Sequence, residues 1–292
     1  MSLYHYTDIN AVKSILENKE LWLTHIGYMN DDEEFISGLE RIADKAIGQS
    51  ASEYLGGQSK EELVNQLIEQ AQDENIFVCS FCQKADLLSQ WRGYTPNNGG
   101  YAVEFDEAVI SDLIDEISQS LNALSLSAEK MARDDEIDTK SRDELIFMDK
   151  YIEISFLKLD SCAYEEADKE ALAIGAAKEW ISMKRRENCK TDFMNTYKSY
   201  LFSSCMMKNK GFSEEKEKRL MVRTSAAEHH RCRDGIFVPY FKFKLPDSAI
   251  KNIWVGPSRY QDLKVKGLSS FLKSLKQDNP IGIKKSVIPL RT

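Results

Sequence analysis

The sequence contains no apolar run long enough to cross a bilayer, and no basic segment followed by an apolar stretch near its N-terminus. It also has no excess of positive charge. The formal net charge is −8 over 292 residues, so we expect no overall attraction to nucleic acid or to an anionic membrane, although a local basic groove is compatible with this charge. These absences predict a cytoplasmic protein with no membrane partner.

Several standard catalytic motifs are also missing. There is no glycine-rich loop ending in Lys-Ser or Lys-Thr, no G-x-S-x-G and no H-E-x-x-H. "CSFC" and "HHRC" could together supply zinc ligands from Cys79, Cys82, His229, His230 and Cys232. However, "IFVCSFC" is typical of a strand, on which residues three apart point to opposite faces. We therefore predict free thiols and no metal.

The chain is 42% hydrophobic and 29% charged, which is typical of a soluble globular protein. It has no internal repeat, low-complexity tract or obvious linker. Apolar runs typical of strands occur along the whole length, and helices of very unequal size interrupt them. This pattern predicts a single α+β domain over residues 1–292, with mainly helical insertions at 107–150 and 166–208.

The stretch "SQWRGYTPNNGG" reads as a loop because of its glycines and proline, yet Trp91, Arg92, Tyr94 and Tyr101 lie in and around it. An arginine beside aromatic rings suits a phosphate joined to a flat ring, since the guanidinium binds the anion and the aromatic side chain stacks. The alternative is that Trp91 anchors the core at a helix end and Arg92 forms a surface ion pair.

The stretch "GFSEEKEKRLMV" combines a charged run with a strand-like ending. If a strand begins near Glu215, then Glu215, Glu217 and Arg219 share one face, while Leu220 and Val222 face the core. Two carboxylates beside a guanidinium would keep one glutamate ionised and oriented. Alone, such a run is more often a solvated helix face with weak ion pairs.

The acidic stretch "GYMNDDEEF" offers oxygen ligands from Asn30 to Glu34 for a metal or a ribose. A helix cap followed by an acidic first turn explains most of these residues more simply. Asn30 stays a candidate ribose contact. His5, between two tyrosines in "LYHYTD", is either a filler in a first strand or part of a site.

These stretches together resemble a large bacterial family of domains of unknown function. The resemblance lies in "LYHYTDINAVKSILENKELWLTHIGYMNDDEEF", "FVCSFCQKADLLSQWRGY", "GGYAVEFD", "GFSEEKEKRL", "IWVGPS" and "IPLR", and leaves the middle helical region unmatched. The N-terminal block is similar, more distantly, to the opening of ADP-ribosyltransferase-like folds, including DNA-modifying toxins and RNA 2′-phosphotransferases. That resemblance implies a split mixed or antiparallel sheet with flanking helices and a helical insertion.

The distant resemblance also implies roles for individual residues, with NAD as a substrate and no metal. His5 would bind the ribose hydroxyl, Tyr94 or Tyr101 would stack on nicotinamide, and Glu217 would be the catalytic carboxylate. Glu215 would complete an E-x-E pattern. Here His5 precedes Tyr6, where the superfamily has a small residue. The other expected NAD contacts are Tyr6, Thr7, Asn30, Ser80, Trp91, Arg92 and Arg219.

The resemblance implies an NAD-consuming ADP-ribosyltransferase or NAD glycohydrolase, acting on a protein or nucleic acid as a toxin or phage-defence effector. A second hypothesis is a non-catalytic module that binds a nucleotide or a nucleic-acid end, using Trp91, Arg92 and Tyr94. A third is a metal-dependent nuclease built on Asn30 to Glu34.

Overall fold

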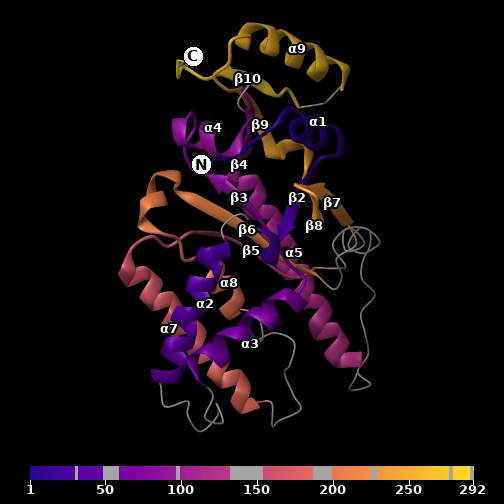
Figure 1. The fold of residues 1–292 in the computed structure, drawn as a ribbon. Helices are drawn as coiled ribbons and strands as arrows, with labels where there is room; N and C mark the ends of the chain where they lie inside the picture. The colour runs from indigo at the N-terminus through magenta and orange to yellow at the C-terminus, as the bar shows by residue number, and fades with distance from the viewer. Residues whose placement is uncertain are drawn as a thin grey trace.

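The structure is a computed structural model that describes residues 1–29, 32–48, 59–96, 99–131, 154–186, 199–224, 229–275 and 279–289. Its centre is one mixed sheet with helices on both faces, which confirms the predicted α+β class (Figure 1). None of the described helices is both long and apolar enough to cross a membrane.

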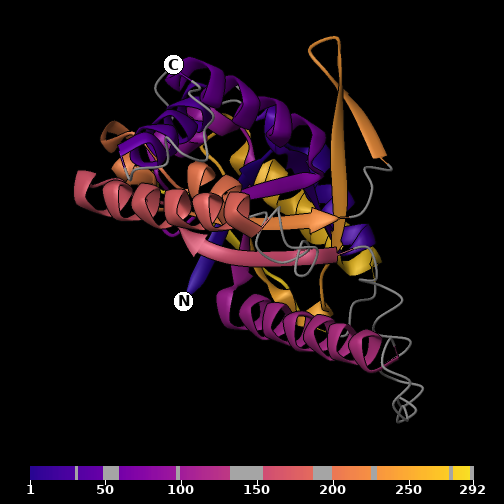
Figure 2. The same ribbon diagram turned by 90° about the horizontal axis from the view of Figure 1, so that it is seen from below.

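Within the described residues the sheet has ten strands, and its longest path runs in the order β10-β9-β4-β1-β3-β2-β8-β7. Among these strands β10 pairs in parallel with β9, and the remaining pairs are antiparallel. β8 turns back on β7 as a hairpin at one edge (Figure 2). The strands are β1 (Ser2–Thr7), β2 (Glu20–His25), β3 (Ile76–Cys82), β4 (Tyr101–Asp106), β5 (Ile154–Ser161), β6 (Glu217–Thr224), β7 (His229–Arg233), β8 (Ile236–Lys244), β9 (Ile250–Val255) and β10 (Gly282–Lys285).

The sheet splits at β3. Along one edge β3 pairs with β6 over its full length. Along the other edge β3 pairs with β1 only at Tyr4↔Cys82. It pairs with β2 only at Thr24↔Val78 and His25↔Phe77. β1 and β2 therefore diverge from a shared partner, and the ladder is interrupted between them.

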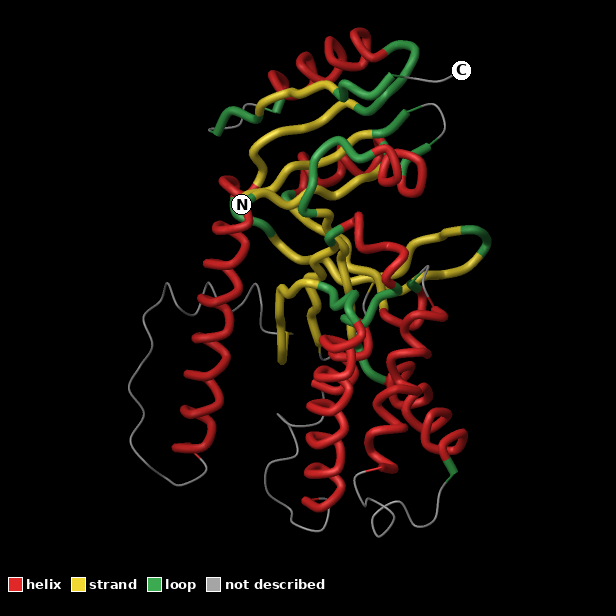
Figure 3. The backbone as a smooth tube through the Cα atoms, turned by 90° about the vertical axis from the view of Figure 1, so that its left-hand side faces the viewer, coloured by secondary structure: helices red, strands yellow, loops and turns green. Residues whose placement is uncertain are grey.

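Helices cover both faces of the sheet. α1, α5 and α9 pack over one face, with Phe77, Phe81 and Val103 in the core between. α2, α3, α7 and α8 pack over the other, around Ile76, Val78 and other residues. Figure 3 shows α5 as the long helix beside the sheet. The helices are α1 (Ile9–Asn18), α2 (Asp32–Gly48), α3 (Lys60–Asp73), α4 (Leu88–Tyr94), α5 (Glu107–Met131), α7 (Glu166–Arg186), α8 (Ser199–Cys205) and α9 (Gln261–Ser274), with short 3-10 turns η1 (Ile26–Tyr28), η3 (Lys210–Glu215) and η4 (Asp247–Ala249).

Local capping explains where two helices begin. Asp8 is the N-cap of α1, since its side chain accepts a hydrogen bond from the Ala11 amide. Ser59 and Glu62 form a capping box at the start of α3, as the spacing of the sequence predicts.

Two local expectations need correction. Residues 88–94 form helix α4 where we expected a loop, because Gly93 is accommodated in the helix and Pro96 follows its end. β6 begins at Glu217, since Glu215 ends the turn η3 and Lys216 adopts a left-handed conformation. The segment "HHRC", which offered possible zinc ligands, lies on strand β7.

Candidate functional site

A small pocket lies where β1 separates from β3, close to the start of β6. Three strands, one helix and one turn line it. β1 contributes Tyr4, His5 and Tyr6; β3 contributes Ser80, Phe81 and Cys82; α4 contributes Gln90 and Tyr94; Glu215 and Glu217 close the far side. The interrupted ladder therefore brings the N-terminal strand and the E-x-E segment together around one cavity of about 70 Å³.

His5 fills the gap in the ladder. Its Nδ1 lies 3.1 Å from the carbonyl oxygen of Ser80, which can only accept a hydrogen bond. Burial lowers the pKa of His5, so the ring is neutral at pH 7 with its proton on Nδ1. Nε2 is then a hydrogen-bond acceptor, and among the described residues it has no partner. His5 thus presents a free acceptor atom in a pocket-lining side chain.

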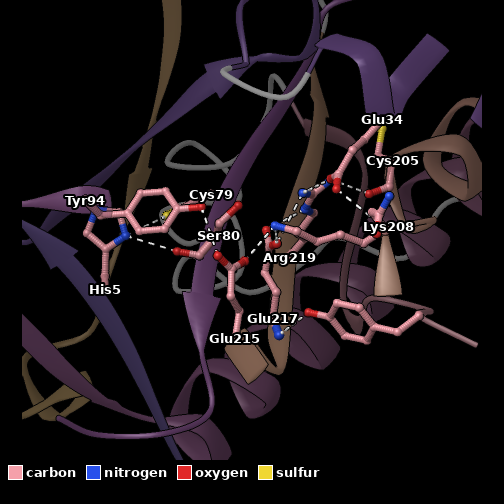
Figure 4. A network of polar contacts seen from close by, with 12 residues as sticks. His5, Glu34, Cys79, Ser80, Tyr94, Cys205, Lys208, Glu215, Glu217 and Arg219 are labelled. Atoms are coloured by element: carbon pink, nitrogen blue, oxygen red, sulfur yellow. Dashed lines mark hydrogen bonds and ion pairs between the residues drawn. The ribbon is translucent and has the colours of Figure 1, made fainter. Parts of the chain in front are cut away.

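The far side of the pocket is a cluster of buried ions around Lys208 (Figure 4). The Lys208 Nζ donates to Glu215 Oε2 at 2.7 Å and to Glu217 Oε2 at 2.6 Å. The Lys208 side chain is only 2% exposed. A single ammonium group therefore holds both glutamates of the E-x-E pattern in place.

Arg219 holds Glu217 from the other side. Its Nε donates to Glu217 Oε1 at 2.6 Å, and its Nη2 lies 3.2 Å from Glu217 Oε2. Nη1 donates to the carbonyl of Cys205 at the end of α8, and Glu34 of α2 lies 3.9 Å from the guanidinium. Both oxygens of Glu217 are therefore paired with cations.

The two cations keep Glu217 ionised. Burial alone would raise the pKa of its carboxyl, but the charge of Arg219 and then that of Lys208 outweigh burial and lower the pKa to about 2. The same pairing raises the pKa of Lys208 and of Arg219. At neutral pH the pocket wall carries a permanently negative, well-oriented carboxylate.

Backbone contacts explain how the sequence places this cluster. The amide of Glu217 donates to the hydroxyl of Tyr164 at 2.9 Å, and the carbonyl of Glu217 accepts from Cys162. Lys208 donates its own amide to the carbonyl of Ala163. The segment after β5 therefore joins the start of β6 to the chain that leaves α8.

Tyr94 approaches the same glutamates from α4. Its hydroxyl donates to Glu215 Oε1 at 3.4 Å, and its side chain is 42% exposed at the pocket. Trp91 anchors α4, because its ring is buried against Tyr6 and its Nε1 donates to Asp86 at 2.8 Å. The exposed Tyr94 ring is thus held beside the cavity by a buried neighbour.

The structure brings six of the predicted site residues to the pocket: His5, Tyr6, Ser80, Tyr94, Glu215 and Glu217. Arg219 lies directly behind Glu217. Four others lie elsewhere: Trp91 is in the core, Arg92 is exposed on α4 outside the pocket, Thr7 ends β1, and Tyr101 faces α1 and α9 on the other face of the sheet. Asn30 lies outside the described residues.

Sequence reasoning missed Lys208, Tyr164 and Gln90. Lys208 follows a helical region without any motif, and its role depends on contacts with residues 215 and 217 that only the fold creates. "CMMKNK" contains one signal that could have marked it, since an apolar run before a lysine predicts a buried ammonium group that needs carboxylate partners.

The part of the chain that the structure describes holds no group of three or more His, Cys, Asp or Glu residues placed to bind a metal. Burial raises the pKa of Cys79 to about 12 and that of Cys82 to about 11, so both are neutral thiols. In the acidic stretch "GYMNDDEEF", the side chain of Glu34 accepts a hydrogen bond from the backbone amide of Asn209.

Comparison with known proteins adds a family match but no activity. Residues 90–220 match a family model described as protein of unknown function (DUF2971). No curated protein and no solved structure matches the chain. The matched segment contains Tyr94, Lys208, Glu215, Glu217 and Arg219, whereas His5 and Ser80 lie before it.

Proposed function

We propose that the pocket binds NAD and breaks its nicotinamide–ribose bond, as an ADP-ribosyltransferase or an NAD glycohydrolase does. The observation that supports this most is the convergence of His5, on the first strand, and Glu217, at the start of β6, on one pocket. A neutral acceptor and a fixed carboxylate suit a sugar ring on which positive charge develops.

The chemistry follows from the positions of three side chains. His5 Nε2 accepts a hydrogen bond from a ribose hydroxyl, and the exposed ring of Tyr94 stacks on the nicotinamide. The bond from C1′ to the pyridinium nitrogen breaks, and its electron pair leaves with neutral nicotinamide. Ionised Glu217 stabilises the resulting oxocarbenium-like charge.

The second half of the reaction requires an acceptor. A nucleophilic oxygen or nitrogen of water, a protein or a nucleic acid forms the new bond to C1′, and its proton passes to solvent. A cavity of about 70 Å³ holds only part of a dinucleotide, so the adenosine half of NAD would lie along the protein surface. Consumption of cellular NAD would account for a toxin or defence role.

The test is incubation with NAD labelled in the adenylate group, followed by measurement of nicotinamide release and label transfer to candidate acceptors. Glu217→Gln should lower turnover about 10²–10³-fold, the usual effect of losing one preorganised electrostatic group. Glu104→Gln is the matched control, since Glu104 is also a buried, hydrogen-bonded carboxylate of the same sheet but lies outside the pocket. It should leave turnover unchanged.

Three results would contradict the proposal: no NAD binding, no nicotinamide release by the wild-type protein with any acceptor tried, or equal activity losses in the two variants. Circular dichroism and thermal unfolding of both variants would show whether the fold persists.

The pairing of both Glu217 oxygens favours a second candidate, a non-catalytic module that binds a nucleotide or a nucleic-acid end. In that case Glu217 serves only the ion cluster. Tyr94→Ala would then abolish nucleotide binding, Glu217→Gln would preserve it, and the wild type would release no nicotinamide. Because Arg92 lies outside the pocket, Arg92→Ala tests whether the bound chain extends along α4.

A further inference from the structure

The hairpin of β7 and β8 lies at one edge of the sheet and extends beyond the neighbouring strands (Figure 2). Between His229 and Lys244 it carries four arginines and lysines but only one acidic residue, Asp234. One of the four, Lys244, is paired with Glu20 of β2. Because the whole chain has a net charge of −8, the positive charge of the hairpin is local, which favours a negatively charged binding partner.

The other three cationic side chains share one face of the sheet. Arg231 and Arg233 lie two residues apart on β7, so they point to the same side. His229, on that side of β7, pairs with Tyr240 of β8, and Lys242 lies two residues beyond Tyr240. The pairing register therefore places both arginines and Lys242 on one side, which we call the cationic face.

Among the described residues, none of these three cations has a carboxylate partner. The Nη2 atom of Arg231 donates to the hydroxyl of Thr24 at 2.6 Å, and that of Arg233 donates to the carbonyl of Tyr28 at 2.6 Å. The Nη1 atoms of both arginines have no hydrogen-bond partner within the same part of the chain. Neutral acceptors thus orient both guanidinium groups and leave their charge uncompensated.

The two arginines also affect each other. Burial, and then the charge of Arg233, lowers the pKa of Arg231, although a guanidinium stays protonated at neutral pH. An anion bound beside both groups would reduce this repulsion and accept hydrogen bonds from their free Nη1 atoms. Phosphate groups are typical ligands of arginines in such an arrangement.

Aromatic rings lie on the same face. Trp22 of β2 stacks on Tyr240 with ring centroids 4.4 Å apart, and His229 lies on the far side of Tyr240 with centroids 5.5 Å apart. Tyr240 is buried in the middle of this row, whereas the rings of Trp22 and His229 at its two ends are partly exposed. Partly exposed rings beside cations are typical of surfaces that bind single-stranded nucleic acid, since bases stack on the rings.

The cationic face continues toward the pocket of His5. Thr24, which accepts the hydrogen bond from Arg231, pairs with Val78 of β3, and Ser80 lies two residues farther along the same side of β3. Ser80 lines the pocket. After burial, the charge of Arg231 is the next cause that lowers the pKa of His5, which indicates that the guanidinium lies near the pocket.

We propose that the cationic face binds a single-stranded nucleic acid. Arg231, Arg233 and Lys242 contact its phosphates, and the rings of Trp22 and His229 stack on its bases. A duplex fits less well, because its bases are stacked on one another and do not reach the rings. Under the proposed function a strand bound here would supply the acceptor, and this last step alone rests on the NAD chemistry.

The test is fluorescence anisotropy of the full chain, without NAD, with labelled single strands of DNA and RNA of about 12 nucleotides. Three phosphate contacts predict that log K falls with log[salt] with a slope of about −2. Arg231→Gln and Arg233→Gln should each weaken binding about tenfold and reduce the slope by about 0.7. The corresponding duplex should bind about tenfold more weakly than the single strand.

Arg259→Gln is the matched control for the lost charge. Arg259 is also an exposed arginine without a carboxylate partner among the described residues, but it follows β9, near the opposite end of the strand order. It should leave both the affinity and the salt slope unchanged.

Trp22→Leu should weaken binding about tenfold by removing a stacking surface. Its control is Trp254→Leu, since Trp254 is also a partly buried tryptophan of the sheet, but on β9. That variant should bind the strand like the wild type. Thermal unfolding shows which variants are folded at the assay temperature, and if Trp22→Leu is not, His229→Ala tests the other end of the aromatic row.

Four results would overturn the proposal. The first is no binding of either single strand, and the second is an equal loss of affinity in Arg231→Gln and Arg259→Gln. The third is a duplex that binds as tightly as the single strand. The fourth is complete displacement of the strand by NAD or by an acidic peptide of equal charge, because a dinucleotide or a protein would then be the occupant. Since NAD is absent from the binding assay, its outcome is independent of whether nicotinamide is released.

Discussion

Two carboxylates are buried in the sheet at nearly the same depth, but their partners differ in kind. Glu104 on β4 is 4% exposed and accepts hydrogen bonds from Ser2, Asn252 and Trp254, with one ion pair to Lys284, whose side chain is 43% exposed. Glu217 on β6 is 5% exposed and is held by two cations that are themselves almost fully buried.

This difference separates a carboxylate that lies only within the sheet network from one that also lines a pocket. Neutral donors satisfy a buried carboxylate without burying a second charge, which is the less costly arrangement for stability. A cluster of buried ions brings a desolvation penalty for every member, and packed apolar side chains would often be as stable. The cluster around Glu217 is therefore better explained by the pocket beside it than by the fold.

The largest expected effect on stability comes from removing Lys208, the lysine that pairs with Glu217. Removal of Lys284, the lysine that pairs with Glu104, is the comparison. Lys208→Met leaves Glu215 and Glu217 facing each other without their shared ammonium, so we expect the free energy of unfolding to fall by about 3–5 kcal/mol. Lys284→Met removes a half-exposed partner of Glu104 and should cost about 0–1 kcal/mol. Urea denaturation at pH 7 measures both.

Equal losses of unfolding free energy in the two lysine variants would contradict the comparison. They would mean that the buried ammonium of Lys208 contributes no more to stability than the half-exposed ammonium of Lys284. If Lys208→Met does not fold, Lys208→Arg retains the charge. It should recover most of the stability, and a failure to do so would point to packing as the cause.

A second test uses pH. The pKa of Glu217 falls from an ordinary 4.5 to about 2, which corresponds to about 3 kcal/mol of stability at neutral pH. Because the folded pKa is the lower one, this stability is present above pH 4.5 and disappears as the pH falls through 2. The difference in unfolding free energy between the wild type and Glu217→Gln should therefore shrink steadily below pH 5.

Urea titrations at pH 7, 5, 4 and 3 would follow this difference. A gap that stays constant over the whole range would mean that Glu217 is not held ionised by Arg219 and Lys208. Glu104→Gln should also lose its effect in acid, because hydrogen bonds from Trp254 and Lys284 outweigh burial and lower the pKa of Glu104.

Most strands and most helices could be predicted from the sequence because their signals are local. "IFVCSFC" is an apolar run with strand propensity, and Ser59 with Glu62 is a complete capping signal. α4 was missed because Gly93 and Pro96 are also typical of loops, while the burial of Trp91 that stabilises the helix depends on Tyr6, far away in the sequence.

The residues of the site could be predicted only where they lie on strands that the fold places next to the same neighbouring strand. His5 and Glu217 lie on strands that pair with the same partner, so their approach follows from the topology. The choice between Tyr94 and Tyr101 depends on which face each residue occupies, which requires the register of β4. The only local signal for Lys208 is the apolar run before it, because the carboxylates that balance its charge are brought close only by tertiary structure.

The smallest expected effect is a change in an NMR resonance, and it compares two buried histidines, His5 and His25. His25 on β2 lies 3.0 Å from the Glu74 carbonyl through Nε2, and its Nδ1 accepts from the Gly27 amide, so both nitrogens are satisfied. Burial lowers the pKa of both His25 and His5, and NMR titration of their Cε1 protons should give values below 6.5 for each. Only His5 has a free acceptor in the pocket, so added NAD should shift the His5 resonance and leave that of His25 unchanged. Equal shifts would indicate a general conformational change, and a shift of His25 alone would place the nucleotide near η1.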